Sequence, residues 1–504
     1  MSTIQRSLAW AEVAPGIWHR DIDEVETFWA QAARAHDTQG RRPFAITGHA
    51  SLQINQVPSS LHKDLSSSLR EAWCRIRHDH PSVASEVNYD FATERFTREY
   101  RTLQNDAERE AWLSSTFIEI ATGQSGVEFA NSDPPAPSLP TLFVIRPSSH
   151  DDSSDCRDIV FRAPHDTIDG VGALLLLKNL LEHASRIFEQ DVTYGIPDFN
   201  GTETQNLSPS YRAAAGVPQQ FTPALQKRVA QMTAEHVAFS TTRAPESKHY
   251  LSPPFVHGAQ SPGRHQRTDI TLDSQTSASI LVACKKLGAT VTHAVNAVIP
   301  IVLRDLVPEG AKNETFYFRW DLLRNLRPFC AAPYNSNKHP VTAYHSGSCF
   351  ACDLVIPPKT DEKSSKDDFE HVLQEISALY RRVADDTEHG LLAPTVWTGW
   401  LQTLPKIKKN PAPGPQPSST PGVTLSSLGR VDGILPSRIG AFRVSRPWIT
   451  GEEMRNGLGL FLTSHQGQLN LAAAYNDAWQ TEEAAQNFLK ACLRSLSTAL
   501  NVEI

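Results

Sequence analysis

The sequence of 504 residues predicts an α/β (α+β) fold made of two lobes of similar size. Helix-like and strand-like patterns alternate irregularly in both halves, and no short repeat links them. Between the halves, residues 194–265 are dominated by Gly, Pro, Ser, Thr and Asn. We therefore expect an N-terminal lobe over 1–193, a crossover linker over 194–268 and a C-terminal lobe over 269–504.

Charge and hydrophobicity exclude several classes of protein. The formal net charge of −7 and the lack of a long Lys/Arg run argue against a nucleic-acid-binding surface. Residues 1–6 lack the apolar core of a secretory signal, and the aliphatic runs 174–177 and 280–283 are far too short to span a membrane. We expect a soluble, cytoplasmic protein without nucleic-acid or membrane partners.

The seven cysteines do not predict a disulfide framework, because their number is odd and they are scattered. Cys349 and Cys352 form a CxxC within the strand-like run 348–356. Residues three apart in a strand face opposite sides, and no second CxxC is present. The pattern favours structural cysteines over a metal or redox site, and we expect no metal.

In the first half, apolar residues at helical spacing and alternating runs predict helices and strands in turn. The helices cover about 25–32, 61–76 and 107–121, and the strands or hairpins cover about 43–54, 142–145 and 158–162. Pro81 ends the second helix, because proline cannot continue the helical hydrogen bonding. The linker holds at most one helix, over 219–239.

The second half shows the same mixture of patterns. Strands are predicted at 269–272 and 315–320, helices at 274–287, 290–306, 367–383 and 481–500, and a hairpin over 457–476 that turns at His465–Gly467. Gly288 ends the first of these helices. Prolines at 411, 413, 415 and 417 predict an extended surface loop over 405–421. The alternative is a basic loop near an anionic ligand, since Lys406, Lys408 and Lys409 precede the prolines.

The candidate active site lies where the strand 158–162 passes into the apolar helix that follows Gly170. His165 is on the connecting turn, which is held from both sides, and imidazole titrates near neutral pH, as a general base must. Asp169 need not touch the imidazole; it can instead pair with an arginine and stiffen the turn. Gly170 removes a side chain where the turn meets substrate or begins the helix. The alternative is that His165 is one ordinary histidine among nineteen.

The segment His165–Gly170 resembles the HxxxDG motif of a known superfamily. This superfamily contains the acyl-CoA-dependent acyltransferases and condensation domains built from two chloramphenicol-acetyltransferase-like lobes. Further similar features follow in the same order: the helix 61–76 with its stop at Pro81, the helix start 288–292, the segment 325–328, the strand 426–429, and the last hairpin and helix. Within the superfamily, the sequence is most similar to fungal trichothecene O-acetyltransferases and related secondary-metabolite acyltransferases.

The resemblance implies an active-site channel between the lobes and direct transfer of an acyl group, expected to be acetyl, from acyl-CoA to a hydroxyl or amine of a small secondary metabolite. His165 would be the base, with no acyl-enzyme. Asp169 would be structural and pair with Arg327, with Arg324 as the alternative. Ser426 or Ser427 would help to hold the oxyanion, although a structural role in the strand is equally open. Acyl-CoA would be a co-substrate rather than a bound cofactor, and the enzyme a monomer.

Two departures from the superfamily pattern bear on the alternatives. Condensation domains usually carry two adjacent histidines, whereas Pro164 precedes His165, which favours the CoA-dependent branch. The DFGWG motif of plant acyltransferases is absent; residues 427–430 lie nearest in position. Condensation with a carrier-protein thioester, a repurposed pericyclase-like scaffold, and a metal-dependent hydrolase using Asp166 with His165 and Asp169 remain as alternatives. In the leading interpretation Asp166 has no role.

Overall fold

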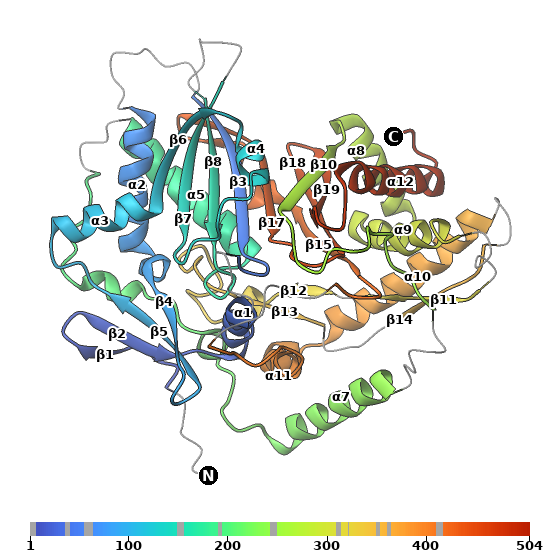
Figure 1. Cartoon of the computed structure of the whole chain (residues 1–504), viewed down its shortest axis with the longest axis horizontal. Helices are drawn as coiled ribbons and strands as arrows, with labels where there is room; N and C mark the ends of the chain where they lie inside the picture. Colours follow the sequence, from blue (N-terminus) through green and yellow to red (C-terminus); the bar gives the residue numbers. More distant parts are fainter. Residues whose placement is uncertain are drawn as a thin grey trace.

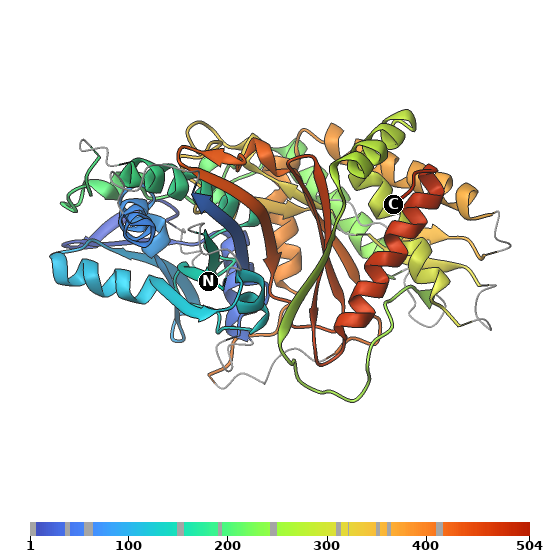
Figure 2. The ribbon, with the colours of Figure 1, turned by 90° about the horizontal axis from the view of Figure 1, so that it is seen from above.

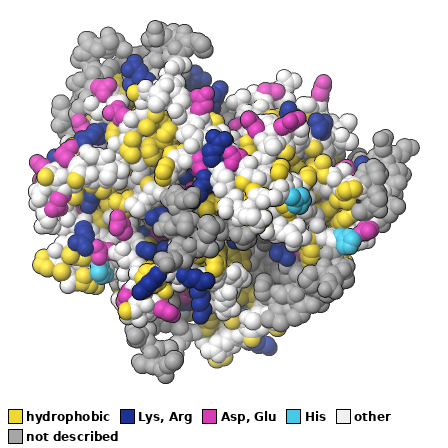
Figure 3. Space-filling model, in the orientation of Figure 1, with side chains coloured by type: hydrophobic (Ala, Val, Ile, Leu, Met, Phe, Trp, Pro, Cys, Tyr) yellow, Lys and Arg dark blue, Asp and Glu magenta, His cyan; other side chains and the backbone are white. Residues whose placement is uncertain are grey.

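The computed structural model describes residues 7–35, 41–54, 64–148, 156–189, 194–241, 249–308, 314–320, 322–348, 353–359, 364–409 and 417–504. The predicted CxxC at Cys349 and Cys352 lies outside these residues, as does 410–416 of the proline-rich loop. Two α/β halves lie side by side, with the first part of the chain mostly in one half and the last part mostly in the other (Figure 1). Acidic and basic side chains are interspersed over much of the face shown in Figure 3.

A six-stranded sheet forms the centre of the first half. Its order is β16 (Arg438–Ile439), β17 (Phe442–Gly451), β3 (Ile46–Ile54), β8 (Cys156–Ala163), β7 (Thr141–Pro147) and β6 (Phe117–Gly123). The strand β17 pairs with β3 from Phe442 opposite Ile54 to Gly451 opposite Ile46, and the two run side by side in Figure 2. The range 269–504, expected to form the C-terminal lobe alone, therefore donates two strands to the first half.

The helices α2 (Leu65–Asp79) and α5 (Gly170–Phe188) pack together against this sheet (Figure 1). Their apolar faces and the sheet form one continuous core, in which Leu69, Trp73, Leu174 and Leu180 are fully buried. Burial of such a stripe is the main driving force for the packing of an amphipathic helix. The helix α3 (Asp106–Thr116) ends earlier than predicted, because residues 117–121 continue as β6 and pair with β7.

A second sheet near the N-terminus was not predicted. Its order is β1 (Ala11–Ala14), β2 (Ile17–Asp21), β5 (Arg95–Arg101) and β4 (Glu86–Asp90), and the helix α1 (Glu24–Ala35) follows β2. In β5, the inward positions are Phe96, Arg98 and Tyr100. A charged residue in an inward position hides the alternation of apolar and polar residues that marks a strand.

The second half contains a four-stranded sheet in the order β10 (His265–Thr271), β19 (Gln468–Asn476), β18 (Leu458–His465) and β15 (Val423–Arg430). The smaller sheet beside it has the order β14 (Asp353–Ile356), β11 (Phe316–Arg319) and β9 (His249–Tyr250). Four helices complete this half: α8 (Ser274–Lys286), α9 (Val291–Asp305), α10 (Ser364–Asp385) and α12 (Glu482–Leu500). Their buried faces share one hydrophobic core with the larger sheet.

Short elements join the two halves. The strands β12 (Leu323–Asn325) and β13 (His345–Gly347) pair with each other, and α11 (His389–Leu401) packs against α1. The linker contains α6 (Tyr211–Ala214) and α7 (Pro223–Thr241), and α4 (Gly126–Asn131) lies beside the first sheet. Single-turn helices span Pro81–Ala84, Thr202–Asn206, Arg327–Phe329 and Val431–Gly433.

No single helix of the described ranges combines the length and apolar character needed to cross a membrane. In the part of the chain that the structure describes, α8 and α9 pass that test only when taken together, and the pair is bent by 89°.

Candidate active site

His165 lies on the turn 164–169, between β8 and α5. Its Nδ1 is 3.1 Å from the backbone carbonyl oxygen of Ile168. Because a carbonyl oxygen can only accept a hydrogen bond, Nδ1 carries the proton in the neutral ring. The unprotonated nitrogen is then Nε2, for which no hydrogen bond is found among the described residues. The turn therefore presents His165 in the tautomer that a general base at Nε2 requires.

Asp169 fastens this turn to the segment that follows β12. The Nη1 of Arg327 donates to both carboxylate oxygens of Asp169 at 2.9 Å, and the backbone N–H of Tyr344 donates to Oδ2 at 2.8 Å. Asp169 also caps α5, since the backbone N–H of Gly172 donates to Oδ1 at 2.7 Å. Burial alone would raise the pKa of Asp169, but the Arg327 guanidinium keeps it below its usual value.

The structure decides between the two arginines that the sequence left open. Arg327 is 4% exposed and pairs with Asp169, which is also 4% exposed. Arg324 points elsewhere, and its Nη1 donates to the backbone carbonyl of Val383 at 2.8 Å. Asp169 thus stabilises the turn through Arg327, and its carboxylate is saturated with structural contacts.

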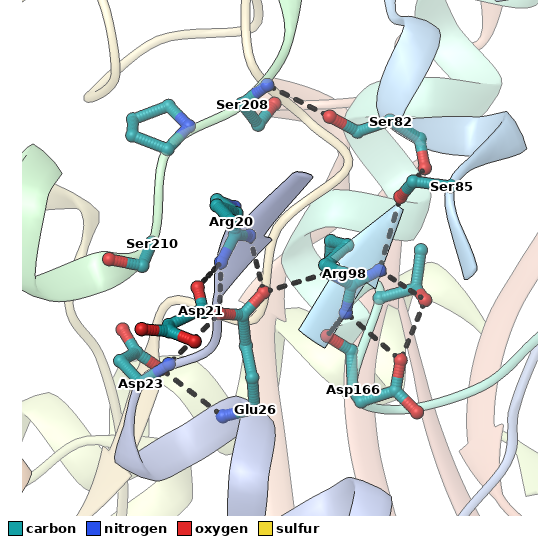
Figure 4. Close-up of polar contacts among 12 residues, drawn as sticks. Arg20, Asp21, Asp23, Glu26, Ser82, Ser85, Arg98, Asp166, Ser208 and Ser210 are labelled. Carbon is teal, nitrogen blue, oxygen red and sulfur yellow. Dashed lines mark hydrogen bonds and ion pairs between the residues drawn. The ribbon is translucent and has the colours of Figure 1, made fainter. Parts of the chain in front are cut away.

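Asp166 was expected to have no role, and this expectation is wrong. Its carboxylate and its backbone carbonyl both accept hydrogen bonds from Nη2 of Arg98, at 3.0 and 2.7 Å (Figure 4). Arg98 also donates to Glu26 of α1, at 3.1 Å, and Glu26 is bound by both terminal nitrogens of Arg20. This buried network ties the turn to β2, β5 and α1, so Asp166 is a structural residue.

Two aromatic rings pack on the His165 imidazole. The ring centroid of Trp29 lies 3.9 Å away with an interplanar angle of 14°, and that of His345 lies 4.8 Å away with an angle of 17°. Trp29 comes from α1 and His345 from β13. Burial in this apolar setting lowers the pKa of His165 to about 4, although the Asp169 carboxylate opposes the shift. At neutral pH His165 is therefore uncharged and able to accept a proton.

The two glycines at the start of α5 differ in how closely they are packed. A Cβ at Gly170 would lie 3.3 Å from Cγ2 of Ile449 and 3.7 Å from Cδ2 of Leu428. A Cβ at Gly172 would overlap the backbone oxygen of Pro340 and lie 2.8 Å from Nη2 of Arg327. Gly172, which was not among the predicted site residues, is therefore the glycine required by the Asp169–Arg327 contact.

This difference gives a paired prediction. Gly172→Ala should lower the free energy of unfolding by about 3 kcal/mol, because the backbone at Pro340 or the Arg327 side chain must move. Gly170→Ala should change the same quantity by less than about 1 kcal/mol, since only the Cγ2 methyl of Ile449 is closely approached and it must shift by a few tenths of an ångström at most. Denaturant unfolding of the two variants measures both values. Equal losses would contradict the assignment of Gly172 as the closely packed position.

The predicted oxyanion residues Ser426 and Ser427 lie on β15, near the start of α5. The hydroxyl of Ser427 is hydrogen-bonded to that of Thr292 at 2.8 Å. Among the contacts of the described residues, none joins Ser426 or Ser427 to His165. Their part in binding an oxyanion therefore stays a prediction, with β15 placed beside the turn through Leu428.

A polar cavity of about 140 Å³ is lined by residues of the turn, α1 and β4. Its lining includes Pro164, Asp166 and Thr167 of the turn, Arg34 of α1 and Asn88 of β4. Within the described ranges, no group of three His, Cys, Asp or Glu side chains is placed to hold a metal ion. His165, Asp166 and Asp169 do not form such a group, because the two carboxylates are held by different arginines.

Comparison with known sequences gives distant relatives of nearly the same length. No family model matches the chain. O-acetyltransferase pigM of Monascus ruber is 25% identical over 503 residues, which cover 99% of this chain and 88% of pigM. Acetyltransferase pigO of the same fungus is 25% identical over 501 residues, which cover 98% of this chain and 99% of pigO.

Comparison with solved structures gives the fold. The structure is similar to that of TRI3 trichothecene 15-O-acetyltransferase from Fusarium sporotrichioides, with a TM-score of 0.77, 18% identity and 99% of each chain covered. It is also similar to the condensation domain of the monacolin K polyketide synthase MokA. That match has a TM-score of 0.60 and 14% identity, and it covers 96% of this chain and 97% of the domain.

Proposed function

The chain has the two-lobed chloramphenicol-acetyltransferase-like fold of the trichothecene acetyltransferases and condensation domains, and from this premise we propose its reaction. We propose that it transfers an acetyl group from acetyl-CoA to a hydroxyl of a small secondary metabolite, with His165 as the general base. One observation carries the proposal: Nδ1 of His165 is held by the Ile168 carbonyl, which leaves Nε2 as the proton acceptor. The names of pigM and TRI3 support oxygen over nitrogen as the attacking atom.

The proposed mechanism is a direct displacement. Nε2 of His165 takes the proton of the acceptor hydroxyl while its oxygen forms a bond to the thioester carbonyl carbon. The tetrahedral intermediate collapses, the carbon–sulfur bond breaks, and the imidazolium gives its proton to the leaving thiolate of CoA. No acyl-enzyme forms. Donor and acceptor enter by a channel between the lobes, and Ser426 of β15 assists the oxyanion.

The proposal includes the conditions under which the enzyme works. Acetyl-CoA is consumed as a co-substrate, and no cofactor stays bound between turnovers. The enzyme acts as a monomer in the cytoplasm on a small-molecule acceptor. The runner-up is condensation with a carrier-protein thioester; it is supported less well, because Pro164 stands where condensation domains carry a first histidine.

A comparison of acyl donors tests the proposal. Purified enzyme is incubated with a fungal metabolite extract and either acetyl-CoA or an acetyl-loaded carrier protein, and thiol release and acetylated products are measured. The proposal expects acetylated products with acetyl-CoA and none above background with the carrier protein. Turnover with the carrier protein alone would favour condensation. Conversion of metabolites without consumption of either thioester would favour a repurposed scaffold.

The low pKa of His165 predicts the pH dependence of this reaction. A histidine with a lowered pKa is neutral, and active as a base, at every pH above that value. We therefore expect kcat/KM to rise with pH through about 4 and to be level near neutrality, whereas an unperturbed histidine would give a limb near pH 6.5. Initial rates after brief pH jumps measure the limb. An acidic limb at pH 6 or above would show that burial does not lower the pKa of His165.

A further inference from the structure

The rings of Trp29 and His345 pack on the imidazole of His165 and form an aromatic cluster with it. The three rings come from separate parts of the fold. The Trp29 ring is inclined by 14° to the His165 ring, and the His345 ring is inclined by 17° to it. The Trp29 and His345 centroids are 5.8 Å apart. If the His165 ring lay between them, the Trp29 and His345 centroids would be about 7 Å apart, which is twice the van der Waals spacing of stacked rings. Trp29 and His345 therefore pack on the same face of His165 and leave its other face uncovered by these two rings.

The edges of Trp29 and His345 are joined by a hydrogen bond. Nε1 of Trp29 donates to Nε2 of His345 at 3.1 Å. His345 must then carry its proton on Nδ1, because Nε2 is the acceptor. Nδ1 lies 3.9 Å from Oδ2 of Asp169 and makes no hydrogen bond among the described residues. The Asp169 carboxylate thus faces the Nδ1–H of His345. The Nε2 of the same His345 ring then fixes the indole N–H of Trp29.

Trp29 is also held on its remaining sides. The Phe44 ring meets it edge-on at 5.5 Å, and Trp397 of α11 does so at 5.9 Å. Phe44 has φ = 58°, a left-handed conformation that is unusual for a bulky residue and is found where the surroundings impose it. Glu26, three residues before Trp29 on α1, is bound by Arg98, the same arginine that holds Asp166 of the turn. The indole and the imidazole are therefore fixed relative to each other.

An indole face next to an imidazole has a specific consequence during proton transfer. The face of an aromatic ring carries negative charge density, and Trp is the most effective of the three aromatic residues at attracting a cation. His165 is neutral at rest, but becomes an imidazolium once it has taken the acceptor proton. The centroid distance of 3.9 Å is well within the range of a cation–π contact.

From these contacts we propose that Trp29, oriented by His345, is a positioning residue that holds the His165 ring and stabilises its imidazolium form during acyl transfer. The proposal rests on the proposed function of His165 as the base. Trp29 itself touches neither donor nor acceptor in this scheme. Its effect is exerted on the transition state, in which His165 is charged, and not on substrate binding.

Substitutions of Trp29 and His345 test the proposal. Trp29→Leu should lower kcat by about 30-fold and Trp29→Phe by about three-fold, with KM for acetyl-CoA within about two-fold of wild type. His345→Leu should lower kcat by about 10-fold, and His345→Gln should recover most of it, since its amide oxygen can accept the Trp29 N–H. Trp112→Phe, which alters a buried indole of the N-terminal core without losing a hydrogen bond, is the matched control and should keep kcat within about two-fold of wild type.

The test separates this proposal from the proposed function. If the wild type is active and Trp29→Leu keeps its kcat, or loses activity through KM alone, the role of Trp29 is refuted while His165 remains the base. If the wild type transfers no acyl group, nitrogen-15 spectra of labelled histidines decide. The His165 signal, assigned by its loss in His165→Ala, should titrate at a lower pH in Trp29→Leu than in the wild type, because the indole face no longer stabilises the imidazolium. An unchanged titration would overturn the proposal.

Discussion

His165→Ala is expected to lower kcat for acetyl transfer by about 10³-fold, the middle of the range for loss of a general base. Without the imidazole, the acceptor hydroxyl must lose its proton to water while it attacks the thioester. The variant still holds donor and acceptor next to each other, and this proximity alone accelerates the reaction, so activity is not abolished. Thiol release from acetyl-CoA in the presence of the acceptor measures the change.

The same variant should retain its fold, because the one hydrogen bond found for the His165 side chain among the described residues is that to the Ile168 carbonyl. Asp169 and Asp166, which carry the structural contacts of the turn, are untouched. His78→Ala, at the end of α2, is a control that removes a histidine bonded to Asp79 outside the site and should keep wild-type activity. If His165→Ala retained activity within about ten-fold of wild type, the general-base assignment would be wrong.

Arg327→Ala is expected to lower the free energy of unfolding by about 4 kcal/mol. The loss is large because Asp169 is 4% exposed and would remain as a buried carboxylate without its cation. The backbone N–H groups of Tyr344 and Gly172 would still donate to it, but they do not neutralise its charge. Chemical denaturation of the variant and the wild type gives the difference.

Arg324→Ala is the matched control, because Arg324 lies three positions away and bonds to the Val383 carbonyl instead. It should cost about 1 kcal/mol. A double-mutant cycle sharpens the test: Asp169→Ala should cost less in the Arg327→Ala background than in the wild type, because no buried charge is left unpaired. Additive losses would show that the two side chains do not interact.

The local part of the fold could be predicted from hydrophobic periodicity. The stripes of α2, α5, α9 and α12 and the hairpin of β18 and β19 are apolar at regular spacing, and the structure contains each of them. The strands β2 and β5 were missed because Arg20 and Arg98 occupy buried positions and are neutralised by Glu26, which lies on α1. The pairing of β17 with β3 was also missed, since periodicity within one strand does not identify a partner from the other end of the chain.

The candidate site likewise has one part that could be predicted from the sequence and another that could not. The sequence placed His165, Asp169 and Gly170 on a turn between strand and helix, because strand, turn and helix are neighbours along the chain. Trp29 looked like one more residue of an amphipathic stripe, and His345 carried no signal, because their contact with His165 arises only from tertiary packing. Asp166 was judged to have no role because its partner, Arg98, lies on a strand that was not predicted.

The central claim is that Nε2 of His165 takes the proton of the acceptor. The most direct measurement is a structure of the enzyme with CoA and the acceptor identified by the donor assay. The account predicts that the reacting hydroxyl oxygen lies about 3 Å from Nε2 of His165, with Nδ1 still bonded to the Ile168 carbonyl. An acceptor whose hydroxyl meets a different base, or a His165 ring turned so that Nε2 faces the protein, would contradict it.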